Sequence, residues 1–83
     1  MIVDKKIELS GGYYIEFGAA TWSDKERSVR NRYDDPTTKR FLPHNSSEIP
    51  FEDLTLLVEY SCREKELAPE LRLRMLKALL TDM

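Results

Sequence analysis

Cysteine and histidine are nearly absent from this 83-residue sequence, which has one of each, Cys62 and His44. A single cysteine excludes a disulfide within the chain and is typical of a reducing compartment, so we expect a cytoplasmic protein. One cysteine and one histidine are also too few for a structural zinc site, which needs four nitrogen or sulfur ligands. We therefore expect neither a metal nor any other cofactor.

Long apolar runs and glycine-rich loops are missing as well. No run is long enough to span a membrane, and none resembles the apolar part of a signal peptide. The three glycines, Gly11, Gly12 and Gly18, are not followed by the Lys-Ser or Lys-Thr pair of a phosphate-binding loop. His44 lies near Ser46, but no base, nucleophile and orienting residue form a recognisable set. We expect no membrane contact and no enzymatic activity.

The composition that remains, 41% hydrophobic and 34% charged, is that of one small soluble globular domain. The net charge of −2 is unevenly distributed along the chain. Residues 25–44 hold six Lys/Arg against three Asp/Glu, whereas residues 45–83 hold five against eight. The basic stretch is either a solvated strand face or a surface for an acidic partner.

The first half of the chain predicts an antiparallel sheet. Residues 3–9 alternate between apolar and polar side chains, which predicts a strand with one face formed by Val3, Ile7 and Leu9. Residues 13–22 predict a second strand with a core face formed by Tyr13, Ile15, Phe17 and Ala19. Its outer face should carry Tyr14, Glu16 and Trp22. Residues 26–33 predict a third strand and residues 39–49 a fourth, in which Pro43 weakens the pairing.

The second half predicts two helices. Residues 50–66 begin with Pro50 at the first helical position and with acidic residues in the first turn. The main apolar stripe of this helix consists of Phe51, Leu54, Leu57, Val58 and Cys62, and Leu56 and Tyr60 form a separate outward ridge. Residues 69–83 predict a second helix opened by Pro69. We thus expect an α+β fold, ββββαα, with a four-stranded antiparallel sheet and both helices packed on one face.

The apolar residues of the second helix cover roughly 220° of its helical wheel, which is too broad for packing on one side only. So small a domain can hardly engulf such a helix, and we therefore expect it to meet another chain in a homodimer. The interface we predict consists of Leu56, Tyr60, Leu73, Leu76, Leu79, Leu80 and Met83.

One combination of residues points to a ligand. Aromatic and basic side chains share the predicted strands, and rings and cations on a curved sheet are the usual means of holding single-stranded nucleic acid. The candidate contacts are Tyr14, Trp22, Arg30, Arg32, Lys39 and Arg40. In an alternative interpretation, Tyr14 and Trp22 anchor a subunit interface.

The stretch Ser47-Glu48-Ile49-Pro50-Phe51-Glu52-Asp53-Leu54 resembles the strand-proline-helix junction of the transcriptional positive-cofactor family and its Pur/Whirly-type relatives. The resemblance implies a homodimer whose sheet binds single-stranded DNA and whose helices pair the two chains. It implies DNA contacts at Trp22, Arg30, Arg32, Lys39 and Arg40, and a role in transcription regulation. The net acidity, Pro43 and the second helix depart from the family pattern.

A different function is predicted by the acidic, apolar second half of the chain. A small phage or mobile-element protein could bind and inhibit a host protein through such an apolar helix surface. Binding of a protein that survives nuclease treatment would separate this hypothesis from nucleic-acid binding.

Overall fold

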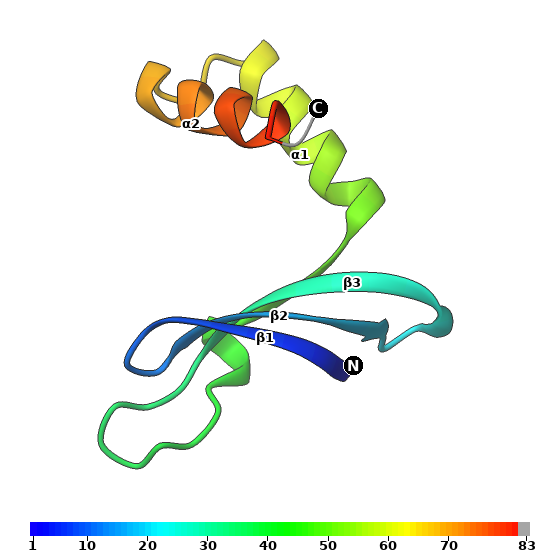
Figure 1. Cartoon of the computed structure of the whole chain (residues 1–83), viewed down its shortest axis with the longest axis vertical. Helices are drawn as coiled ribbons and strands as arrows, with labels where there is room; N and C mark the ends of the chain where they lie inside the picture. The colour runs from blue at the N-terminus through cyan, green and yellow to red at the C-terminus, as the bar shows by residue number, and fades with distance from the viewer. Residues whose placement is uncertain (82–83) are drawn as a thin grey trace.

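The computed structural model describes residues 1–81. Its sheet contains β1 (Ile2–Ser10), β2 (Tyr13–Ala20), β3 (Ser23–Tyr33) and β4 (Ser47–Pro50), paired antiparallel in that order. A 3-10 turn, Pro43–Asn45, precedes β4, and the helices α1 (Phe51–Arg63) and α2 (Pro69–Leu79) follow it. The predicted ββββαα order is confirmed (Figure 1).

The first strand is less regular than its sequence alternation suggested. The pairing of β1 with β2 shifts between Val3 and Lys5, so that Val3 lies opposite Gly18 but Ile7 lies opposite Ile15. Because Gly18 and Ile15 are on opposite faces of β2, Val3 and Ile7 are too, and the predicted shared face was wrong. At the shift the two strands approach very closely, since a Cβ atom on Gly18 would lie 1.9 Å from the carbonyl oxygen of Ile2.

We predict that Gly18→Ala lowers the free energy of unfolding by about 1–3 kcal/mol, because β1 would have to move away from β2. Gly11→Ala is the matched control, since a Cβ atom there would meet no atom within 4 Å. Urea unfolding of the two variants and the wild type measures the difference. Equal stability of the two variants would contradict the close approach.

The predicted fourth strand, residues 39–49, is wrong in its first part, because most of residues 34–46 form a loop. The carboxylate of Asp35 accepts hydrogen bonds from the backbone N–H groups of Thr37 and Thr38, at 2.8 and 2.9 Å. Lys39 then adopts a left-handed conformation (φ 63°), and Pro43 begins the 3-10 turn. These local bonds hold the chain out of the sheet until Ser47.

Both helices are shorter than predicted. Pro50 is the last residue of β4 and precedes α1, which begins at Phe51 rather than Pro50. The helix ends at Arg63 rather than Glu66, because Lys65 is left-handed (φ 59°) and the N–H of Glu66 bonds to the carbonyl of Ser61 at 2.9 Å. Helix α2 ends at Leu79, and the last two residues of the predicted helix, 82–83, lie outside the described residues.

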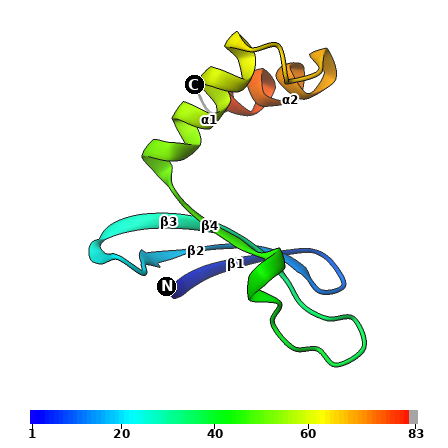
Figure 2. The ribbon, with the colours of Figure 1, turned by 180° about the vertical axis from the view of Figure 1, so that it is seen from behind.

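Both helices lie on the same side of the sheet but stand away from it (Figures 1 and 2). Helix α1 is attached at its start, where the ring of Phe51 stacks on Phe17 with centroids 6.3 Å apart. The helix then points outward, and α2 lies beside its outer half (Figure 1).

The chain by itself has almost no apolar core. Among the described residues, Ala20 is the one hydrophobic residue that is buried. The accessible area is 6789 Å², whereas a compact monomer of 9.7 kDa exposes about 5,100 Å². The radius of gyration, 14.5 Å, also exceeds the value of about 11.8 Å for a compact chain of this length. The fold thus leaves apolar surface exposed that a monomer would normally bury.

Candidate functional site

One face of the sheet, here called the polar face, carries charged and hydroxyl side chains on its central strands. The pairing of β2 with β3 places Tyr14 opposite Arg32, Glu16 opposite Arg30 and Gly18 opposite Ser28. Glu16 is only 1% exposed, so the prediction that it faces outward to solvent was wrong. A carboxylate so deeply buried requires charged partners.

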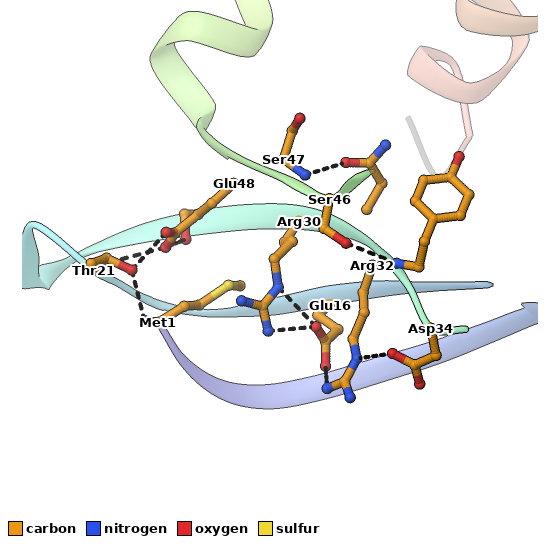
Figure 3. Close-up of polar contacts among 12 residues, drawn as sticks. Met1, Glu16, Thr21, Arg30, Arg32, Asp34, Ser46, Ser47 and Glu48 are labelled. Carbon is orange, nitrogen blue, oxygen red and sulfur yellow. Dashed lines mark hydrogen bonds and ion pairs between the residues drawn. The ribbon is translucent and has the colours of Figure 1, made fainter. Parts of the chain in front are cut away.

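The partners of Glu16 are two arginines of β3, and Figure 3 shows the carboxylate between them. Arg30 donates from Nε and Nη2 to Oε1 of Glu16 at 2.9 and 2.7 Å, and Arg32 donates from Nη1 to Oε2 at 3.4 Å. The Nε group of Arg32 also donates to Asp34 at 2.8 Å, and this hydrogen bond raises the pKa of Arg32. Two cations and two carboxylates make the cluster electrically neutral. We call Glu16, Arg30, Arg32 and Asp34 the arginine cluster.

An aromatic ring from the long loop closes the arginine cluster. The guanidinium carbons of Arg30 and Arg32 each lie 4.7 Å from the ring centroid of Phe41. Stacking on the ring adds a cation–π attraction and keeps water from the ion pairs. Strand periodicity does not predict this contact, because Phe41 reaches the cluster through a loop and not through a strand.

A second polar centre on the same face surrounds Glu48 of β4. The backbone N–H and the hydroxyl of Thr21 donate to its carboxylate at 3.0 and 2.7 Å, and the buried Ser28 hydroxyl donates at 2.8 Å (Figure 3). Burial raises the pKa of Glu48, but the hydrogen bonds from Thr21 and Ser28 outweigh it and hold the pKa below the usual 4.5. Glu48 thereby ties the short strand β4 to the turn between β2 and β3.

We predict that Glu48 makes the protein less stable in acid. The pKa of Glu48 is lower in the folded protein than in the unfolded chain. Its ionised carboxylate therefore adds to the free energy of unfolding above the unfolded pKa of 4.5, and this contribution is lost as the pH falls through the folded pKa. Glu48→Gln should therefore unfold more easily than the wild type at pH 7, with a smaller difference at pH 3. Urea unfolding at the two pH values measures this. An equal difference at both values would contradict the role of the ionised carboxylate.

The predicted nucleic-acid contacts are only partly brought together. Tyr14, Arg30 and Arg32 share the polar face, where the ammonium group of Lys6 lies 4.1 Å from the ring centroid of Tyr14. Lys39 and Arg40 are exposed in the loop at one end of the sheet. Trp22 is exposed in the turn at the opposite end, where its indole N–H donates to Glu26 (Figure 1).

The opposite face of the sheet, here called the apolar face, is mainly hydrophobic, although Lys5, Arg27 and Asn31 also occupy positions on it. The register aligns Ile7 with Ile15 and Phe17 with Val29, and Val29 in turn with Ile49. These residues and the remaining alternate positions of β2 confirm the predicted core face of Tyr13, Ile15, Phe17 and Ala19. Helix α1 departs from this face, through the stacked Phe51, without covering it.

An open groove of about 750 Å³ lies between β4 and α1. Its apolar wall includes the predicted interface residues Leu56 and Tyr60, which are 50% and 54% exposed. Acidic residues from three segments of the chain also line it, namely Glu48, Asp53, Glu64 and Glu66, although the carboxylate of Glu48 is bonded to Thr21 and Ser28. We call it the acidic groove, and the sequence did not predict it because its lining comes from β4, α1 and the turn after α1.

The predicted interface residues of α2, Leu73, Leu76, Leu79 and Leu80, are each more than half exposed, and Met83 lies outside the described residues. The other side of α1 faces α2, since Val58 and Cys62 line a common gap with α2 residues, namely Pro69, Arg72, Leu73, Met75, Leu76 and Leu79. The main apolar stripe of α1 is therefore directed in part at α2, and the Leu56 and Tyr60 ridge borders the acidic groove instead.

Two classes of site find no support in residues 1–81. No group of three or more His, Cys, Asp or Glu side chains there could hold a metal ion. Within the same residues, no helix has the length and apolar character needed to cross a membrane. The chain matches no family model, no curated protein and no solved structure.

Proposed function

We propose that this chain is a protein-assembly module, which works by joining its apolar sheet face and its acidic groove to another polypeptide. The observation that carries the proposal is the accessible area, which exceeds that of a compact monomer by about 1,700 Å². An excess of total accessible area of this size, combined with large apolar side chains that are half exposed, is expected where protein contacts protein.

The electrostatics of the surface favour a protein over a nucleic acid. Arg30 and Arg32, the two strand cations that would best hold phosphates, are already paired with Glu16 and Asp34. Breaking those pairs would leave the buried carboxylate of Glu16 without a counter-charge, at a high energetic cost. The acidic groove would repel phosphate directly.

Sedimentation velocity of the fluorescently labelled chain tests the proposal, both in buffer and in nuclease-treated extract of the cells that make it. We expect the chain to sediment as a complex in at least one of the two. The proposal fails if the chain is folded and sediments as a single 9.7 kDa species in both. A stoichiometric host protein in the complex would support the inhibitor hypothesis.

Binding of single-stranded nucleic acid by a homodimer is the second candidate, and the exposed cations Lys39 and Arg40 favour it. They lie at the end of the sheet whose polar face holds Tyr14, and each base stacked on an aromatic ring contributes about 1–3 kcal/mol. Anisotropy of a labelled oligo-dT at low and moderate salt tests this candidate. Binding should weaken with salt and with K39E/R40E, and absence of binding at low salt would exclude it.

A further inference from the structure

Helix α2 carries an apolar ridge that its own chain leaves exposed. Leu73, Leu76 and Leu80, the last of which directly follows the helix, come at helical spacing and are each about half exposed, although Leu73 and Leu76 also line the gap toward α1. At 100° per residue, Arg72 and Lys77 flank this row by about 40° on either side, with Arg72 on the side toward the chain's own α1. We call these five residues the basic ridge.

The basic ridge matches the acidic groove in both shape and charge. The groove offers Leu56, Leu57 and Tyr60 as an apolar wall with carboxylates around it, and the ridge offers leucines with cations on both sides. From these observations we propose that the acidic groove is filled by the basic ridge of a second copy of this chain. The inference rests on the proposed protein-assembly function and names its partner.

The chain's own α2 does not occupy the acidic groove. Val58 and Cys62, which face α2, lie about 160° around α1 from Leu56 and Tyr60, which line the groove. The described residues of α2 are likewise absent from the groove lining. The ridge that fills the groove must therefore come from another molecule.

The charges also decide which helix of the second copy binds in the acidic groove. If α1 of one copy packed against α1 of the other through their grooves, Asp53 and Glu64 would meet the same carboxylates of the partner. Such like-charge contacts cost several kcal/mol, whereas Arg72 and Lys77 of α2 bring opposite charge. A two-fold dimer then uses the groove and the ridge of each chain once.

The area available suits such a dimer. The excess of about 1,700 Å² per chain amounts to about 3,400 Å² for two chains. Obligate homodimers bury about 2,000–5,000 Å². One reciprocal contact of this size would bury the excess accessible area of both chains.

Charge reversal tests the inference. Variant E64K/E66K reverses the groove at the end of α1, where added lysines suit the helix dipole, and variant R72E/K77E reverses the ridge. Each variant alone should dimerise at least about 100-fold more weakly than the wild type. An equimolar mixture should form a heterodimer of near wild-type affinity, because both of its groove–ridge contacts again pair opposite charges. Sedimentation velocity and native mass spectrometry measure the species.

The control is K25E/R74E, which reverses two exposed cations outside the groove and the ridge and should dimerise like the wild type. The inference is overturned if either reversed variant keeps wild-type affinity, or if the mixture fails to pair. Recovery of a folded heterodimer from variants that are unfolded alone would support it. If the wild type binds only a different protein, the inference fails and the proposed function stands; a wild type that binds no protein contradicts both.

Discussion

Glu16→Ala is expected to lower the free energy of unfolding by about 3–5 kcal/mol, the usual cost of removing one partner from a buried ion pair. The substitution would leave Arg30 without its only carboxylate partner in the described structure, at a position where its side chain is mostly buried. Arg32 would keep Asp34, so the loss should fall mainly on Arg30. Denaturation by urea or guanidinium measures the change.

The matched control is Glu59→Ala, which removes an exposed carboxylate from Arg63 one helical turn away. Exposed pairs of this kind contribute about 0–1 kcal/mol, so this variant should be nearly as stable as the wild type. Both variants remove a glutamate that is 2.7 Å from an arginine, but Glu16 is buried and Glu59 is exposed. Similar losses in the two variants would contradict a structural role for the arginine cluster.

Leu56→Glu is expected to abolish assembly while the single chain stays folded. Leu56 lies on the wall of the acidic groove and is half exposed, so a glutamate costs the isolated chain little. In the assembly the same carboxylate would be buried among apolar side chains and other carboxylates, and we expect the dissociation constant to rise at least about 100-fold. Light scattering measures the mass, and circular dichroism measures the fold.

Leu9→Glu is the control for this prediction, because Leu9 is 58% exposed, slightly more than Leu56 at 50%, but lies on β1 outside the groove. It should leave the groove contact intact. The prediction is contradicted if Leu56→Glu keeps the wild-type mass, or if it loses its fold at concentrations where Leu9→Glu remains folded.

The structure changes how the resemblance to single-stranded-DNA-binding domains can be used. The strand-proline-helix junction is present, with β4 ending at Pro50 and α1 starting at Phe51. Of the DNA contacts that the resemblance implied, however, Arg30 and Arg32 are engaged in the arginine cluster. Lys39, Arg40 and Trp22 are the implied contacts that remain exposed, and they lie at opposite ends of the sheet.

The parts of the fold that were predicted correctly depend on regular local patterns. The apolar alternation of β2 is uninterrupted from Tyr13 to Ala19, so one face could be assigned from residue spacing alone. Pro50 and Pro69 similarly marked where the helices begin to within one residue. The exposure of Leu76 and Leu80 followed from the breadth of the apolar arc on α2.

The sequence-based predictions that were wrong concern positions whose structure depends on residues distant in the sequence. Glu16 alternates like a surface residue, and only the neighbouring strand shows that Arg30 and Arg32 bury it. The start of β4 depends on backbone bonds to Asp35 in the preceding turn, which compete with strand pairing. The acidic groove likewise exists only because α1 leaves the sheet after Phe51, and helical periodicity does not give the direction of a helix.

The mass of the purified wild-type chain in solution tests the central claim most directly, namely that a second copy of this chain covers the exposed apolar surface. Light scattering across a hundredfold range of concentration should give about twice 9.7 kDa at high concentration, because α2 of each copy fills the groove of the other. A folded species of 9.7 kDa throughout that range would contradict the account.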